Sequence, residues 1–168
     1  MDKKQFWEIV AQSRPTKDAH PEDCEPKLIE LLKRLEADEI VEWNHIFDQL
    51  AKDAYTCDQL AACIQINAGA GDDGFYYYRC WLIGMGQEVY ENALANPDSL
   101  ADVVSLDEEA EAEIYAAAHR AWMAVTGNPD TAPYPARNER TELTGEEWDI
   151  DDEDEVAKRM PRLSKMYD

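Results

Sequence analysis

The segment from Gly74 to Tyr90 limits what this chain can fold into more than any other part of the sequence. It reads G-F-Y-Y-Y-R-C-W-L-I-G-M-G-Q-E-V-Y, in which only Arg79, Gln87 and Glu88 have charged or amide side chains. A helix that is apolar on nearly every side must be surrounded by other elements of the protein. We therefore predict a central apolar helix over about residues 72–94.

Helical spacing recurs along the chain, whereas the alternation typical of β-strands is hardly seen. Apolar residues three and four positions apart lie on one face of a helix. Such stripes comprise Ile40, Trp43, Phe47, Leu50 and Ala54; Phe75, Tyr78, Leu82, Met85 and Val89; and Ile114, Ala118, Ala121 and Val125. Gly84 and Gly86 each cost a helix about 1 kcal/mol relative to alanine, so we expect another helix to cross there at short range. The predicted fold is all-α, a compact multi-helix bundle.

Local signals predict where several helices begin and end. Ser105 and Glu108 have the spacing of a capping box ahead of a helix over 107–126, which Gly127 should end. The pair Asn96-Pro97 is typical of the first turn of a further, short helix.

The C-terminal part of the chain reads as a loop followed by a helix. Residues 128–151 contain three prolines and many acids with little periodicity, which predicts an exposed acidic loop. A C-terminal helix is expected over 152–168, although Pro161 should bend or shorten it. At this length we expect residues 1–168 to form a single helical domain.

The charge of the chain is strongly unbalanced, with 16 basic and 37 acidic residues. Residues 98–155 hold 3 of the basic and 18 of the acidic residues, and so supply a net charge of −15 out of −21. Such a field attracts a basic protein and repels the phosphates of a nucleic acid, although it can also serve solubility alone. The candidate partner surface comprises Asp107, Glu108, Glu109, Glu111, Asp151, Asp152, Glu153 and Asp154.

The sequence also predicts where the protein resides. The N-terminus has no apolar run of signal-peptide length and nowhere do 18 apolar residues follow one another, so we expect a cytoplasmic protein without a membrane partner. The four cysteines lack a C-x-x-C spacing, which favours reduced structural thiols over disulfides. They are Cys24, Cys57, Cys63 and Cys80.

Residues 69–74 match the G-x-G-x-x-G pattern of dinucleotide-binding loops. Asp72 and Asp73 would place two negative charges where a pyrophosphate must lie, and no alternation of strands and helices surrounds them. We expect instead that Asp72 or Asp73 accepts hydrogen bonds from the first N–H groups of the central helix, and that either stays available to a cation.

Arg79 lies inside the apolar helix, where a charge is costly unless it is paired. We predict a carboxylate partner, either Asp72, Asp73 or an acid of a helix over 38–57. Together with Trp81, these residues form a candidate site for a ligand: Asp72, Asp73, Arg79 and Trp81.

Two further motifs are incomplete. Glu42-x-x-His45 is half of a di-iron motif whose second copy is missing, so His45 is interpreted as a surface or edge residue. The acidic run from Asp149 has Asp154 and Met160 where a calcium-binding EF-hand loop needs glycine and glutamate. The sequence therefore predicts no catalytic residue, no metal ligand and no cofactor.

The run from Asn67 to Phe75, with Tyr78-Arg79, Trp81-Leu82-Ile83, Gly86 and Val89, resembles a bacterial family known as domain of unknown function 4240. Phe6-Trp7, the run 96–100 and Pro161-Arg162-Leu163 match it as well. The resemblance implies a compact bacterial helical domain and no catalytic residues. Family members usually read G-C-S-D-D-G-F where this chain has Ala70-Gly71 before the acidic pair, so this member lacks the serine hydroxyl.

These observations favour a non-enzymatic acidic interaction or regulatory module that binds a basic protein partner. The alternative is an enzyme, or a binder of a small ligand or divalent cation, with its site near Asp72, Asp73, Arg79 and Trp81. A subunit with a purely structural role is a third possibility, because the sequence leaves the oligomeric state open.

Overall fold

The computed structural model of this protein describes residues 1–135 and 142–167, and helices make up most of them. The α-helices are α1 (Lys3–Ser13), α2 (Pro21–Leu32), α3 (Ala37–Asp53), α4 (Cys57–Asn67), α5 (Asp72–Gly84), α6 (Gln87–Ala95), α7 (Ala117–Thr126), α8 (Glu153–Arg159) and α9 (Pro161–Tyr167). The 3-10 helices are η1 (Pro97–Asp102) and η2 (Ile114–Ala116). The described residues contain no β-sheet, and an isolated bridge joins Thr56 to Thr144. The all-α prediction is confirmed.

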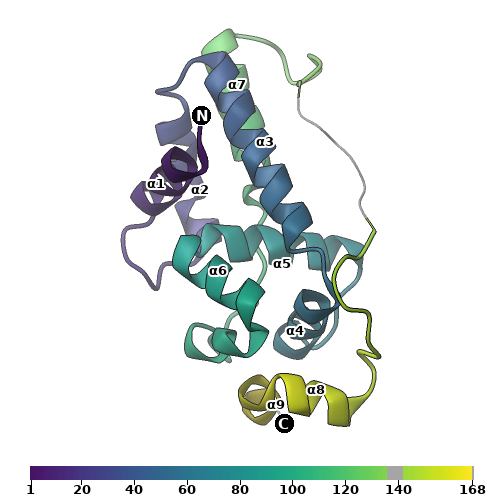
Figure 1. The fold of residues 1–168 in the computed structure, drawn as a ribbon. Helices are drawn as coiled ribbons and strands as arrows, with labels where there is room; N and C mark the ends of the chain where they lie inside the picture. Colours follow the sequence, from purple (N-terminus) through teal and green to yellow (C-terminus); the bar gives the residue numbers. More distant parts are fainter. Residues whose placement is uncertain (136–141, 168) are drawn as a thin grey trace.

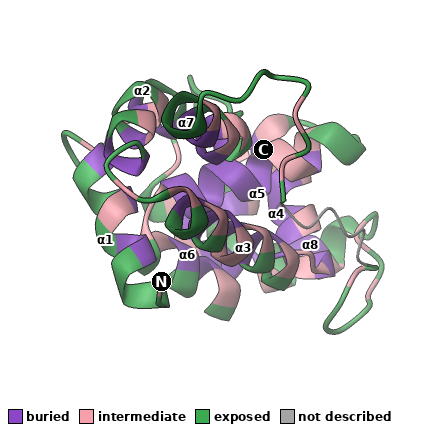
Figure 2. Ribbon diagram, turned by 90° about the horizontal axis from the view of Figure 1, so that it is seen from above, coloured by how far each residue is buried: buried purple, intermediate pink, exposed green. Residues whose placement is uncertain are grey.

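Helix α5 lies among the other helices and contacts α2, α3, α4, α6 and η2. Figure 1 shows it running across the molecule, with α3 standing above it and α4 and α6 below it. The view from above shows α5 with neighbours on several sides and most of its ribbon buried (Figure 2). Its buried residues are Phe75, Tyr78 and all of 79–84.

The apolar segment predicted as one helix over 72–94 is two helices. Helix α5 ends at Gly84 and α6 begins at Gln87, and between them Gly86 has a φ of 96°. This left-handed conformation favours glycine, so Gly86 redirects the chain and is not a crossing point. At Gly84 the expected close approach is present, because a Cβ there would lie 2.5 Å from the Cβ of Pro21 in α2.

Helices α3 and α7 pack against one another, and Figure 1 shows both above α5. The stripe predicted for α3 is wholly buried, and none of its five side chains is more than 3% exposed. In the stripe predicted for α7, Ile114, Ala118 and Ala121 are buried, whereas Val125 is 40% exposed.

The helix predicted over 107–126 begins about three turns later than expected. Residues 105–113 form an irregular segment, and α7 starts at Ala117 after η2. The hydroxyl of Ser105 accepts a hydrogen bond from Asp107 N in a local turn, and no capping box forms with Glu108. The backbone of this segment is paired elsewhere. Asn67 exchanges two side-chain hydrogen bonds with Ala110, and Ala112 N donates to Tyr77 O at 3.2 Å.

The C-terminal helix predicted over 152–168 is divided at Met160 into α8 and α9, and Pro161 is the first residue of α9. A proline has no N–H to donate, so it begins a new helix more readily than it continues one. The buried carboxylate of Asp98 in η1 accepts hydrogen bonds from Arg162 N at 2.8 Å and Leu163 N at 3.0 Å, and so caps α9.

The loop predicted over 128–151 is described in two parts, 128–135 and 142–151, and residues 136–141 of that prediction lie outside the described residues. Neither described part contains a helix. Tyr134 and Trp148 are half-buried in these parts, and both pack against the core.

The four cysteines are free thiols, and all four are buried. Burial raises the pKa of Cys63 and Cys80 to about 12, which keeps both thiols protonated at neutral pH. None of the helices in residues 1–135 or 142–167 has the length and hydropathy that crossing a membrane requires.

Candidate functional site

A cleft of about 680 Å³ opens where three parts of the chain meet. Its lining comes from the connection between α1 and α2 at 17–20, from 81–92 in α5 and α6, and from η1 with the segment that follows it, to Ala110. We call this space the acidic cleft. Its volume lies within the range of cavities that hold small ligands or the side chains of a partner.

The apolar lining of the acidic cleft is contributed mainly by α5, α6 and the end of η1. Trp81 is only 3% exposed, whereas Met85 and Val89 are half-buried. The redirection of the chain at Gly86 places α6 at an angle to α5, so residues of both helices border one space. Val103 and Val104, which follow η1, also border it.

The charged lining is mostly negative. Five carboxylates take part: Asp18, Glu88, Asp102, Glu108 and Glu109. Within the described residues only Asp102 has an ion-pair partner, the guanidinium of Arg162, whose hydrogen bonds hold the pKa of Asp102 below its ordinary value. Lys17 supplies the lining's one full positive charge. The cleft can therefore stabilise a cation more readily than an anion.

Two contacts fix the connection between α1 and α2 at the rim of the cleft. Arg14 donates a hydrogen bond to Gly84 O at 2.6 Å, at the end of α5, where the last carbonyls of a helix lack partners of their own. His20 Nε2 lies 3.1 Å from Glu109 O and so joins this connection to the segment after η1. Neither contact uses a carboxylate of the cleft, so the acidic side chains stay exposed.

The residues predicted for a ligand site near the start of α5 are not brought together. Asp72 and Asp73 are exposed in its first turn, but Gly71 is the N-cap and no side chain caps the helix there, so the predicted cap is wrong. Arg79 is buried on another side of α5 from Trp81, since residues two apart on a helix point in nearly opposite directions. Only Trp81 borders the acidic cleft.

The predicted carboxylate partner of Arg79 is also wrong. Among the described residues no acid pairs with Arg79, whose Nη1 donates to Ala51 O at 2.8 Å. Its guanidinium lies 4.5 Å from the ring centroid of Tyr55 and 4.9 Å from that of Phe75. The carbonyls at the end of α3 carry partial negative charge and need donors, so they satisfy a buried arginine as a carboxylate would. Burial lowers the pKa of Arg79 from its ordinary value.

The predicted acidic partner surface falls into two places. Asp107, Glu108, Glu109 and Glu111 belong to the segment after η1, where the first three are exposed and Glu111 is half-buried. Asp151, Asp152, Glu153 and Asp154 are exposed at the start of α8, and the side chain of Asp152 caps that helix. Burial, followed by the charge of Glu109, raises the pKa of Glu111 above its ordinary value.

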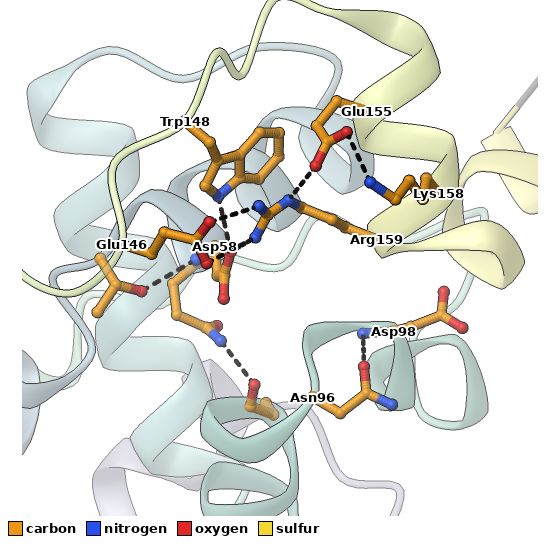
Figure 3. Close-up of polar contacts among 11 residues, drawn as sticks. Asp58, Asn96, Asp98, Glu146, Trp148, Glu155, Lys158 and Arg159 are labelled. Atoms are coloured by element: carbon orange, nitrogen blue, oxygen red, sulfur yellow. Dashed lines mark hydrogen bonds and ion pairs between the residues drawn. The ribbon is translucent and has the colours of Figure 1, made fainter.

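A polar cluster ties α8 to α4 beside the second acidic group (Figure 3). Arg159 binds Glu155 and Glu146 at 2.8 and 2.9 Å, and its guanidinium lies 4.6 Å from the ring centroid of Trp148. Trp148 Nε1 donates to Asp58 in α4 at 2.8 Å. Asp58, Glu146 and Glu155 thus have a positively charged partner within the chain, Arg159.

Within the two described stretches, no group of three or more His, Cys, Asp or Glu side chains is placed to hold a metal ion. His45 is half-buried in α3, and its Nε2 lies 3.2 Å from Pro135 O, consistent with the edge position predicted for it.

Sequence reasoning identified Trp81, Glu108 and Glu109 of the acidic cleft but missed Asp18, Glu88 and the valines after η1. These residues come from segments far apart in the chain, and no local spacing connects them. The apolar run continues through Gly86 and therefore gave no indication of the turn that brings α6 to the cleft.

The comparisons with known proteins identify a family and nothing more specific. The family model that matches is described as protein of unknown function (DUF4240), and it covers residues 1–130. No curated protein and no solved structure matches the chain.

Proposed function

The chain belongs to the DUF4240 family of proteins of unknown function, and we propose that this member is a non-enzymatic acidic interaction module that binds a basic protein partner. The observation that carries the proposal is the acidic cleft, where carboxylates without ion-pair partners in the described residues surround an apolar lining. Exposed charges of one sign attract a partner of the opposite sign over a distance and orient it before contact.

The distribution of charge supports this function. Residues 98–155 supply a net −15 of the −21 charges of the chain, and Asp107, Glu108 and Glu109 are consecutive and exposed. The second acidic group, Asp151, Asp152, Glu153 and Asp154, lies at the start of α8, where the N-terminus of the helix already stabilises negative charge and Asp152 caps it. The acidic cleft is therefore the stronger of the two candidate surfaces for a basic partner.

The alternative of a small-ligand or divalent-cation site at Asp72, Asp73, Arg79 and Trp81 has less support, because these side chains do not face a common space. Its remaining element is the exposed pair at the start of α5. Addition of Mg²⁺ or Ca²⁺ should leave the melting temperature unchanged. An increase that the double variant Asp72→Ala, Asp73→Ala abolishes would favour the alternative.

The proposed function is tested by capture of partners from a lysate of the source cells on the immobilised full-length protein. We expect a basic protein to bind at about 50 mM salt and to be released at about 300 mM, since salt screens exposed charges. A variant that lacks three charges beside the cleft should capture less of it: Asp107→Asn, Glu108→Gln and Glu109→Gln.

The matched control loses the same charge from the N-terminal half, by Glu8→Gln, Asp38→Asn and Asp53→Asn, and should capture as much as the unmodified protein. The three control positions are exposed. If no salt-sensitive basic protein is captured, the proposed function is wrong. If both variants lose the captured protein equally, it binds through the overall charge of the chain and not beside the acidic cleft.

A further inference from the structure

The rim of the acidic cleft exposes apolar side chains as well as acids. Val103, which lines the cleft, is 38% exposed, and Leu106, between the lining residues Ser105 and Glu108, is 62% exposed. Among the large apolar side chains of the described residues, Leu106 is the most exposed. Exposed apolar residues next to a cleft mark surfaces that bind another molecule. A ligand of the acidic cleft is therefore expected to carry apolar groups as well as positive charge.

The apolar lining fits the stem of a long basic side chain. Lysine and arginine bury their methylene groups against apolar surface while the charged end stays with polar groups. Met85 and Val89 provide such a surface on one side, with Glu88 on the same helix turn. An inorganic cation would leave this apolar surface uncovered, so the lining favours a cation that carries an aliphatic chain.

The chain itself shows how this region receives a basic segment. On the side of η1 that faces α9, Arg162 forms hydrogen bonds with Asp102 through two nitrogens, and the next residue, Leu163, is fully buried. Asp102 also lines the acidic cleft, so the contact with α9 and the cleft share one carboxylate. A basic residue followed by leucine thus already packs within the chain on one side of Asp102. On the cleft side of Asp102, acidic and apolar side chains are available to a similar pair of residues from a partner.

We infer that the acidic cleft binds a basic amphipathic segment of the partner protein. A lysine or arginine side chain enters the cleft along Met85 and Val89, and a leucine-sized residue of the same segment packs on Val103 and Leu106. The inference rests on the proposed function and specifies its site and the chemistry of its ligand. It uses the same pairing of apolar anchors with charge that directs other peptide-binding grooves.

The test measures the fluorescence anisotropy of labelled synthetic peptides with the full-length protein. One peptide carries lysines, arginines and leucines arranged so that a helix has one basic and one apolar side. The second peptide replaces each leucine by serine and keeps the charge. We expect the leucine peptide to bind about tenfold more tightly, which corresponds to about 1.4 kcal/mol, because a leucine side chain buried on the rim leaves water and a serine gains little there.

Two variants of the protein distinguish binding in the acidic cleft from attraction by the overall negative charge of the chain. Leu106→Ser should weaken the leucine peptide about tenfold and leave the serine peptide unchanged. The pair Glu108→Gln, Glu109→Gln should weaken both peptides about five- to tenfold, whereas the control pair Glu8→Gln, Asp38→Asn changes either by less than about twofold. All these side chains are exposed, and unchanged melting temperatures would show that the variants fold.

The results distinguish the inference from the proposed function. If the peptides bind but respond equally to the cleft pair and the control pair, the cleft is not the site, while the proposed function stands. If neither peptide binds at low salt, both fail. If the unmodified protein is a dimer that Leu106→Ser dissociates, a second copy covers the rim and the inference is overturned.

Discussion

The close approach of α2 to α5 at Gly84 predicts that Gly84→Ala destabilises the protein. A Cβ at this position would lie 2.5 Å from the Cβ of Pro21 and 2.9 Å from Cδ1 of Ile114, closer than Cβ atoms in proteins lie to other atoms. Pro21 is buried in the first turn of α2, and its ring has little freedom to move away.

The magnitude follows from two opposing contributions. Overpacking a tight contact costs about 1–3 kcal/mol, and the clash with a rigid ring places Gly84→Ala in the upper part of that range. The better helix propensity of alanine offsets about 1 kcal/mol of this cost. We therefore expect the free energy of unfolding to fall by about 1–2 kcal/mol.

Gly74→Ala in the same helix is the matched control. Its Cβ would lie 3.1 Å from Oε1 of Glu111, at the far end of a flexible, half-buried side chain that can move. The gain in helix propensity then dominates, and we expect the free energy of unfolding to rise by up to about 1 kcal/mol.

Urea-induced unfolding followed by tryptophan fluorescence measures both changes, provided that the slope of the transition is unchanged. The opposite signs at Gly84 and Gly74 are the expected result. If Gly84→Ala is as stable as the unmodified protein, or more stable, the reasoning about close packing between α2 and α5 is refuted.

Three further predictions concern buried or half-buried polar groups. Burial raises the pKa of Asp48 from its ordinary value of 3.8 to about 6, so the folded state holds this proton more tightly and stability falls as pH rises from about 4 to 6. Asp48→Asn should therefore raise the free energy of unfolding at pH 7.5 by about 1–2 kcal/mol, a value reduced for solvent screening. Below pH 4 the same variant should be about as stable as the unmodified protein, and urea titrations at the two pH values measure the difference. Asp98→Ala should lower the free energy of unfolding by about 1–3 kcal/mol, because two backbone N–H groups of α9 lose their acceptor. Faster hydrogen exchange at the amides of Arg162 and Leu163 would show that the stability is lost at the start of α9. Arg79→Met should lower the free energy of unfolding by about 1–3 kcal/mol, since Ala51 O is left without its donor; an unchanged thermal midpoint would contradict this role.

The sequence predicted those parts of the fold that depend on local spacing. The stripe from Ile40 to Ala54 is buried as expected, Gly127 ends α7 with a φ of 70°, and Asn96 accepts the first hydrogen bond of η1. Pro161 divides the C-terminal helix. Each of these outcomes follows from residues within a few positions of one another.

Other features depend on contacts between distant segments. The run from Phe75 to Tyr90 is apolar apart from Arg79, Gln87 and Glu88, because α5 and α6 both have buried faces, so its hydropathy gives no sign of the turn at Gly86. Between Glu109 and Ile114, exposed or half-buried acids alternate with buried alanines. That alternation is typical of an extended segment, whereas the spacing of Ser105 and Glu108 is typical of a capping box, and the two local signals predict different structures.

The candidate site was predicted least well, for a related reason. Arg79 donates a hydrogen bond to a backbone carbonyl at the end of α3. Every residue has such a carbonyl, so the pattern of side chains in the sequence cannot identify this partner. The acidic cleft joins 17–20, 81–92 and the region from η1 to Ala110, which only the tertiary fold places together.

Titration of the isotope-labelled protein with the basic leucine peptide, followed by the chemical shifts of its backbone amides, tests the central claim most directly. We predict that the largest shift changes occur at Glu88, Val89 and the residues from Val103 to Ala110. Changes confined to the start of α8, or saturable binding that leaves 103–110 unperturbed, would contradict the assignment of the acidic cleft as the surface that binds a basic partner.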